Sequence, residues 1–194
     1  SGSAFANPIR MAADEGWIAG ARRVLSPNSD GRPAGAEISL AVLHSISLPR
    51  GRYARDAGGS AIERLFTNRL DPAEHPSFAD LAGLRVSAHF LIHRDGELLQ
   101  FVPLPQRAWH AGVSRWRGRE RCNDFSVGIE LEGVEGGRFA AAQYGSLAVL
   151  LGKLQTVLPL RDVAAHSDVA PGRKSDPGPR FDWARFLQEL ARRA

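Results

Sequence analysis

The chain has 194 residues, which is enough for one domain with a sizeable core and short for two. Hydrophobic residues make up 43% and charged residues 24%, which excludes a disordered chain, and no apolar run approaches the roughly 20 residues of a membrane-spanning helix. The formal net charge is only +4 and no basic block is long, so charge gives no support for a nucleic-acid partner.

The N-terminus gives the limits of the domain, and the cysteine content indicates which disulfides and metal sites are possible. Residues 1–10 are small and polar and precede Met11, so we interpret them as a tag or vector remnant and assign the domain to residues 11–194. No secretory signal is visible, which predicts a cytoplasmic protein, and we expect a monomer. The single cysteine, Cys122, cannot form an internal disulfide, and it leaves any metal site to histidine and carboxylate ligands.

The first predicted elements are a loop and a buried strand. Residues 26–33 combine proline, glycine, asparagine and aspartate, which are typical of turns. Residues 38–44 are mostly apolar and predict a buried strand with Leu40, Val42 and His44 on one face. His44 therefore stands at a strand end, and strand ends open onto clefts more often than strand middles do.

A short helix and a hairpin follow. Ser60 and Glu63 have the spacing of a capping box, which predicts the beginning of a helix. Residues 86–92 and 97–102 are predicted to form two strands, and the Asp-Gly pair at 95–96 between them is typical of a hairpin.

The second half of the chain alternates strands and helices irregularly. Residues 126–131 predict a strand, the leucines of residues 141–158 have helical spacing, and residues 163–165 predict a short strand. A loop rich in proline and glycine follows at 166–179, and Asp182 is placed to cap a terminal helix. The predicted buried side of that helix is Trp183, Phe186, Leu187 and Leu190. This order predicts one α+β domain, with a central mixed β-sheet flanked by helices.

Two histidines and an aspartate are candidate ligands of a catalytic metal ion. His44 and His166 each end an apolar run, and Asp176 follows ten positions after His166. The prolines between them stiffen the loop, which lowers the entropy cost of bringing both side chains to one ion. Two histidines and one carboxylate leave one zinc position open for water, as catalytic zinc sites do. The alternative is that Asp176 only caps a turn.

Two glutamates and a lysine could complete such a site. Glu130 and Glu132 lie two apart in a predicted strand and share a face, so either could be a general base or both could lie on a solvated sheet face. The pattern does not choose between them. Lys174 is placed to stabilise an oxyanion if Asp176 is a ligand, and is otherwise an exposed loop lysine.

Other aromatic residues allow two interpretations. Trp109 and His110, beside small residues, form a sugar-stacking platform or belong to the core. His89 lies in mid-strand and is interpreted as a buried histidine with its hydrogen bonds satisfied, or as a support for a site residue. His75 and His93 are predicted to be surface or turn residues.

Together these motifs resemble the AmpD-type N-acetylmuramoyl-L-alanine amidases, which are related to the peptidoglycan recognition proteins. The matching segments are residues 15–17, 26–27, 42–44, 46–49, 71–72, 75–76, 84–89, 107–114, 119–126, 128–133, 166–171, 173–178 and 181–183. They follow one order from about Met11 to the terminal helix, which makes chance similarity a poor explanation. The family fold is a mixed central sheet flanked by helices.

The resemblance implies a set of site residues. The family's zinc ligands fall on His44, His166 and Asp176, its catalytic glutamate falls on Glu130, and its catalytic lysine falls on Lys174. Its substrate-binding positions fall on Arg85, Trp109, His110, Arg121 and Ser45. The two arginines suit the carboxylates of a stem peptide, because a guanidinium group binds a carboxylate through two parallel hydrogen bonds.

The implied reaction is zinc-dependent hydrolysis of the amide bond between (1,6-anhydro-)N-acetylmuramic acid and L-alanine in cytoplasmic muropeptides, in peptidoglycan recycling. One position departs from the family, which usually has asparagine where this chain has Ser45. Because serine has a single shorter hydroxyl, we expect a change in affinity or sugar preference without loss of activity. The alternatives are a non-catalytic peptidoglycan-binding module and a periplasmic amidase acting on polymeric peptidoglycan.

Overall fold

The structure, a computed structural model, describes residues 16–194. The predicted tag at residues 1–10 and the predicted start of the domain at Met11 lie outside the described residues. No helix formed by residues 16–194 is both long and apolar enough to cross a lipid bilayer.

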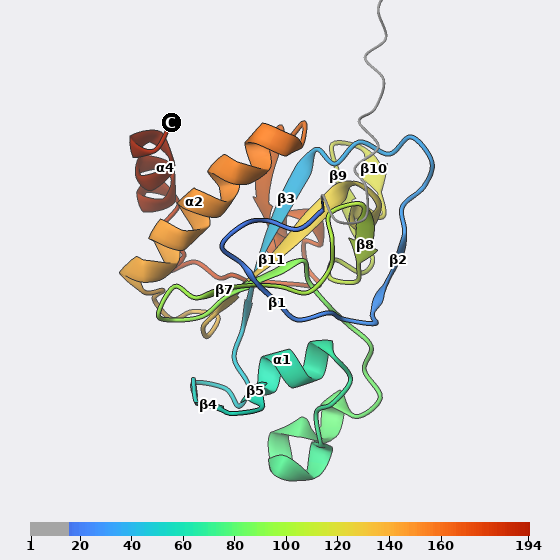
Figure 1. Cartoon of the computed structure of the whole chain (residues 1–194), viewed down its shortest axis with the longest axis vertical. Coiled ribbons are helices and arrows are strands. Elements are labelled where there is room, and N and C mark those ends of the chain that lie inside the picture. The colour runs from blue at the N-terminus through green and yellow to red at the C-terminus, as the bar shows by residue number, and fades with distance from the viewer. Residues whose placement is uncertain (1–15) are drawn as a thin grey trace, which may run out of the picture.

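A six-stranded mixed sheet runs through the centre of the molecule (Figure 1). Its strand order is β1 (Arg22–Arg23), β7 (Leu98–Gln100), β6 (Phe90–Ile92), β11 (Ser126–Glu132), β3 (Leu40–Ile46) and β12 (Asp162–Ala165). β6 and β7 form the predicted antiparallel hairpin, and every other neighbouring pair in this sheet is parallel. The mixed sheet with flanking helices that the sequence predicts is therefore confirmed.

Helices cover both faces of the sheet. α2 (Ala141–Val157) and α4 (Trp183–Arg192) lie side by side on one face (Figure 1). The leucines of α2 pack there with Leu43 of β3 and Ile129 of β11, which are both fully buried. α1 (Ala61–Phe66) packs against Leu91 of β6, whose side chain points to the opposite face from its neighbours Phe90 and Ile92.

The terminal helix confirms its predicted cap and corrects its predicted buried side. The carboxylate of Asp182 accepts a hydrogen bond from the backbone N–H of Arg185 at 2.9 Å. Phe186 is 1% exposed, as expected, but Leu187 is 57% exposed. Successive residues of a helix are about 100° apart, so the face that meets α2 through Phe186 turns Leu187 towards solvent.

Several short elements were not predicted, because two or three residues carry no periodic pattern. The short antiparallel pairs are β2 (Ser29–Gly31) with β8 (Gln106–Ala108), β4 (Arg55–Asp56) with β5 (Gly59–Ser60), and β9 (Arg115–Trp116) with β10 (Arg119–Glu120). The short helices are η1 (Pro72–Glu74), η2 (Pro76–Leu81), η3 (Cys122–Phe125) and α3 (His166–Val169). The first strand of the hairpin begins at Phe90 and not at residue 86, because the N–H of Ser87 bonds to Trp109 outside the sheet.

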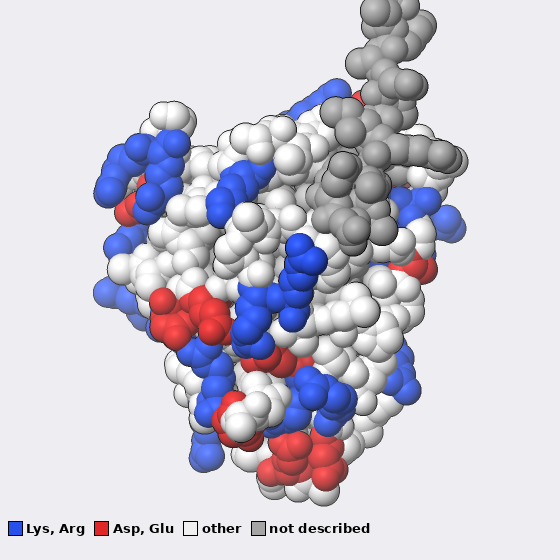
Figure 2. Space-filling view, in the orientation of Figure 1, with Lys and Arg blue, Asp and Glu red and all other residues white. Residues whose placement is uncertain are grey.

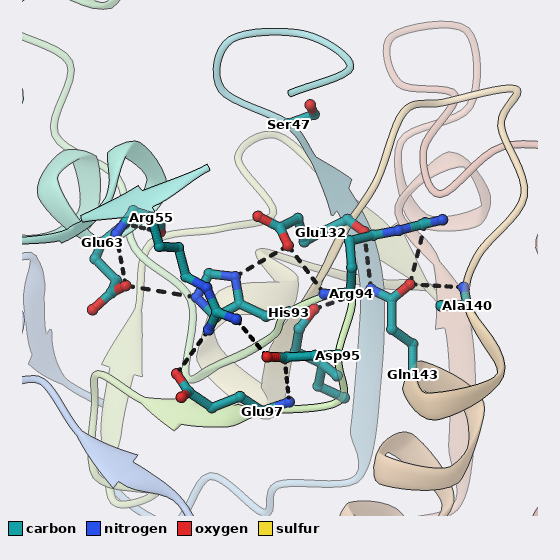
Figure 3. A network of polar contacts seen from close by, with 12 residues as sticks. Ser47, Arg55, Glu63, His93, Arg94, Asp95, Glu97, Glu132, Ala140 and Gln143 are labelled. Carbon is teal, nitrogen blue, oxygen red and sulfur yellow. Dashed lines mark hydrogen bonds and ion pairs between the residues drawn. The ribbon is translucent and has the colours of Figure 1, made fainter. Parts of the chain in front are cut away.

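His93 begins a turn, as one of its two predictions has it, but it is not at the surface, because its ring lies in a buried ion-pair network (Figure 3). Its Nδ1 lies 3.2 Å from Glu132 of β11, and its Nε2 lies 3.6 Å from Glu63 of α1. Burial alone would lower the pKa of His93, but the contacts with these two carboxylates outweigh burial and raise it to about 9. The prediction followed the neighbouring turn, whereas α1 folds over that turn and covers the ring.

Basic and acidic side chains are interspersed on the face seen in Figure 2. Several are paired, as Arg22 is with Glu63 and Glu97 and as Arg55 is with Asp95. Because the potentials of neighbouring positive and negative charges cancel at longer distances, these pairs give the face no extended electrostatic potential of one sign.

Candidate active site

Three adjacent strands end at the same edge of the sheet and bring three of the predicted site residues together. In the parallel ladder of β3 and β11, His44 lies directly opposite Glu130. β12 pairs with β3 up to Ala165, which lies opposite Leu43, so the next residue, His166, arrives beside His44. The register of the sheet therefore places both histidines and the glutamate in one row.

The loop after α3 returns Asp176 to the two histidines. The backbone N–H of Ser167 donates to the carbonyl oxygen of Asp176 at 3.1 Å, which closes the loop. Oδ2 of Asp176 then lies 3.3 Å from the Nδ1 atoms of both His44 and His166, and these two nitrogens are 2.9 Å apart. The three ligand atoms lie within 4.8 Å of one another, as the sequence predicts for a shared metal ion.

The protonation of these groups suits a metal ion. Nε2 of His166 lies 3.0 Å from the carbonyl oxygen of Ala111, which can only accept, so Nε2 is the donor and Nδ1 is the ring nitrogen that faces the cluster. Burial lowers the pKa of His44 to about 4, although its contact with Asp176 opposes this, so the ring is neutral near pH 7. Burial would raise the pKa of Asp176, but its contacts with His166 and His44 lower it, so it is a carboxylate. The Nδ1 atoms of the two histidines and the carboxylate of Asp176 could hold a metal ion here.

Glu130 is buried beside this cluster and keeps one oxygen free. Its Oε1 lies 4.0 Å from Nδ1 of His44, and its Oε2 has no hydrogen-bond partner among residues 16–194. Burial and the charge of Asp176 raise the pKa of Glu130 well above its usual value, and the charge of Lys174 opposes them. Such a carboxyl group is placed to hold a proton or to bind a water molecule.

Glu132, the other candidate for the general base, faces away from the cluster. Its carboxylate accepts from the backbone N–H of Arg94 at 3.0 Å and pairs with His93. The two glutamates share a face of β11, as predicted, but the groups around them differ.

The cluster lines a cavity of about 560 Å³. Lys174, Ser45, Trp109 and His110 line the same cavity. The apolar part of the lining, called here the apolar wall, includes Leu65, Phe66, Leu81, Leu84 and Val86. A lining that combines charged and apolar groups suits a ligand that combines a polar reacting group with an apolar or ring-shaped portion.

The two arginines assigned to substrate lie outside this cavity. Arg85 is exposed, between Leu84 and Val86 of the cavity wall. Arg121 lines a neighbouring cavity of about 600 Å³, and Arg173 borders both cavities. All the other predicted site residues meet at the main cavity.

The contacts behind the histidines were not predicted. Nε2 of His44 lies 2.8 Å from Nδ1 of His110, a neutral ring because burial lowers the pKa of His110 well below its usual value. The carbonyl of Ala111 accepts from His166 and from Arg173. A backbone carbonyl leaves no signal in a sequence. The only indication of a role for His110 in the sequence was its position next to Trp109, a candidate sugar-stacking residue.

His89 is a buried histidine with its hydrogen bonds satisfied, in agreement with one of its two interpretations. Its Nε2 lies 2.9 Å from the carbonyl oxygen of Gln106, and its Nδ1 accepts from the N–H of Gly128 at 3.1 Å.

Known proteins match this chain over most of its length. Residues 34–179 match the family model of the N-acetylmuramoyl-L-alanine amidases. The 1,6-anhydro-N-acetylmuramyl-L-alanine amidase AmpD of Escherichia coli K12 is 53% identical over 178 residues, which are 91% of this chain and 95% of that protein. The crystal structure of a selenomethionine AmpD derivative matches with a TM-score of 0.86 at 53% identity and covers 93% of this chain and 99% of that chain.

A more distant structure contains a ligand. It is the complex of the amidase AmiD from Escherichia coli with the substrate anhydro-N-acetylmuramic acid-L-Ala-D-gamma-Glu-L-Lys, which is 29% identical with a TM-score of 0.57 and covers 81% of this chain and 60% of that chain. The sequence match spans most of the chain and the fold match is close. The chain therefore belongs to the N-acetylmuramoyl-L-alanine amidase family, in the group of the 1,6-anhydro-N-acetylmuramyl-L-alanine amidases.

Proposed function

We propose that this protein hydrolyses the amide bond between (1,6-anhydro-)N-acetylmuramic acid and L-alanine of muropeptides in the cytoplasm, as a step of peptidoglycan recycling. The observation that carries the proposal is the convergence of His44, His166 and Asp176 beside the buried Glu130 in one cavity. The 53% identity to AmpD of Escherichia coli supports this choice of bond, since that enzyme is a 1,6-anhydro-N-acetylmuramyl-L-alanine amidase.

His44, His166 and Asp176 would hold a zinc ion, which this set of nitrogen and oxygen donors suits. Zinc supplies Lewis acidity, which favours the attack of water on an amide carbonyl near neutral pH. Three protein ligands would leave room for a small molecule at such an ion.

Glu130 moves the proton. Its free Oε2 takes a proton from the attacking water as the oxygen bonds to the lactyl carbonyl carbon of the muramic acid. The same carboxyl group then delivers this proton to the leaving nitrogen of L-alanine as the amide C–N bond breaks. The products are the lactyl carboxylate of the sugar and the free amine of the stem peptide. No bond to the protein forms.

Lys174 stabilises negative charge in this reaction. It lines the cavity with Glu130, and its charge acts on that carboxyl group. A cation beside the carbonyl oxygen favours the tetrahedral state, in which that oxygen becomes anionic.

The remaining substrate contacts surround these groups. Trp109 offers an aromatic face to the sugar, and Ser45 lines the cavity where its own backbone N–H donates to Asp176 at 3.3 Å. Arg85, on the rim, and Arg121, in the neighbouring cavity, are assigned to carboxylates of the stem peptide.

Mass spectrometry of the products tests the proposal. Zinc-loaded protein is incubated with an anhydro-muropeptide and, separately, with its reduced non-anhydro counterpart. We expect the free anhydro sugar and a stem peptide that begins with L-alanine, with loss of activity on chelation and recovery on addition of zinc. Activity that survives complete chelation contradicts the zinc mechanism. Tight binding without cleavage would identify a binding module, and preferential cleavage of intact cell wall would identify a polymer-specific amidase.

A further inference from the structure

One short segment contacts both histidines of the metal cluster from behind. This segment, residues 110–112, lies between β8 and β9. The ring of His110 meets His44, and the carbonyl of Ala111 meets His166. A ring nitrogen can ligate a metal only if the proton is on the other nitrogen, so these contacts decide which nitrogen is available.

The ring nitrogens of His110 are both occupied by protein partners. Nδ1 lies 2.8 Å from Nε2 of His44, and Nε2 lies 3.1 Å from the hydroxyl oxygen of Ser126. If Nδ1 of His44 keeps its lone pair for the cluster, Nε2 of His44 donates to His110, and His110 donates to Ser126. His110 therefore lines the cavity without offering a free nitrogen to a sugar.

The polypeptide around the segment is built to hold it in place. The side-chain oxygen of Asn123 accepts from the backbone N–H groups of both His110 and Ala111, at 3.2 and 2.9 Å. Arg173 donates to the carbonyl of Ala111 from the far side. A Cβ atom on Gly128 would lie 2.5 Å from the ring of His110, so the glycine leaves the space that the ring needs to reach His44.

We propose that His110 is a positioning residue of the metal site, which fixes Nδ1 of His44 as the ligand atom, and that it is not a sugar contact. The carbonyl of Ala111 performs the same task for His166. The inference rests on the proposed function, because it assumes that the cluster binds zinc.

The test measures zinc affinity by competition with a chromophoric zinc chelator. His110→Phe keeps a ring of similar size but removes the acceptor, and we expect about 10–100-fold weaker zinc binding, the range for lost supports of metal ligands. His110→Asn places an amide oxygen near the position of Nδ1, and we expect it to restore most of the affinity.

Histidine ¹⁵N NMR of the zinc-loaded protein provides a second measurement. In the wild type we expect both His44 and His166 to show an Nε2–H group in a hydrogen bond. In His110→Phe we expect the Nε2–H signal of His44 to shift, because its acceptor is lost, and that of His166 to be unchanged, because the carbonyl of Ala111 still accepts from it. If His110 had only a structural role, its replacement would not change the signal of His44 and leave that of His166 unchanged.

Trp109→Leu is the matched control, since Trp109 is adjacent and lines the same cavity but has no hydrogen bond to either ligand among the contacts described. We expect it to raise KM and to leave zinc affinity unchanged. If His110→Phe does not fold, Ser126→Ala removes the acceptor for His110, and we expect a smaller loss of zinc affinity in the same direction.

The outcomes separate this inference from the proposed function. A wild-type protein that binds no zinc contradicts both. Tight zinc binding in the wild type, with unchanged zinc affinity and raised KM in His110→Phe, contradicts the positioning role alone and makes His110 a sugar contact. If His110→Phe does not fold and Ser126→Ala is measured in its place, unchanged zinc affinity in Ser126→Ala contradicts the positioning role in the same way.

Discussion

Single residues of the same type have different tasks because of the groups around them. Glu130 and Glu132 lie two apart on β11 and are both buried. Glu130 keeps one oxygen without a partner among residues 16–194, beside the candidate metal ligands, whereas Glu132 pairs with His93 and with the N–H of Arg94. The first environment favours proton transfer, and the second fixes structure.

Substitution by glutamine separates these two tasks. We expect Glu130→Gln to lower kcat by about 10²–10⁴-fold, because the amide cannot take a proton from water. Its zinc content should not change. Glu132→Gln is the matched control, and we expect it to lower thermal stability while keeping kcat within a few-fold of wild type. Near-normal kcat in Glu130→Gln with zinc bound would remove Glu130 from the role of general base.

Lys174 can be tested in the same way. Lys174→Met keeps the apolar stem and removes the charge, so we expect kcat to fall by about 10²–10³-fold, as for the loss of one group that stabilises an oxyanion. Lys153→Met is the control, since Lys153 lies on α2 and contacts the carbonyl of Ala19 outside the site. Unchanged kcat in Lys174→Met would leave Lys174 as an exposed loop lysine.

At the scale of elements, the His93 network joins α1 to the sheet (Figure 3). α1 supplies Leu65 and Phe66 to the apolar wall of the cavity, so the same contacts hold one side of the site. The groups that face His93 are the carboxylates of Glu132 and Glu63 and, with opposite effect, the guanidinium of Arg55.

This network predicts a fall in stability at alkaline pH. The pKa of His93 is about 9 in the folded protein and about 6.5 in an unfolded chain, so protonated His93 stabilises the fold fully below pH 6.5. This contribution, no more than about 3 kcal/mol, is lost as the pH rises through 9. Urea unfolding from pH 6 to 10 measures it. In Glu63→Gln we expect a shallower pH dependence, because one of the two carboxylates is neutralised; an equal slope would contradict the role of His93.

At the scale of the molecule, the cluster exists only in the folded chain. His44 and Glu130 come from two strands, His166 directly follows a third, and a loop returns Asp176 to them. An ion that binds this arrangement, and not the unfolded chain, must stabilise the whole fold.

Zinc should therefore raise the thermal unfolding temperature. At free zinc of about 100 times Kd the expected stabilisation is about 2.7 kcal/mol, which corresponds to several degrees for a chain of this size. Differential scanning calorimetry with and without a chelator measures it. Asp176→Asn should fold and show a much smaller shift, and an equal shift in this variant would place the ion elsewhere.

Local patterns in the sequence determined the longer elements and most of their buried faces. These patterns are the apolar run of β3, the capping box of Ser60 and Glu63, the leucine spacing of α2 and the cap by Asp182. Each of them depends on neighbours within a few positions. The candidate ligand types were also visible, since a chain with one cysteine leaves histidine and carboxylate as the donors for a zinc ion.

Only the tertiary structure decided which segments meet. The burial of His93 depends on α1, the exposure of Leu187 depends on the face that meets α2, and the partners of His110 come from β3 and β11. The different surroundings of Glu130 and Glu132 likewise depend on the ladder that sets Glu130 opposite His44. Burial and hydrogen-bond partners arise from contacts between positions far apart in the chain, and no local pattern of residues encodes them.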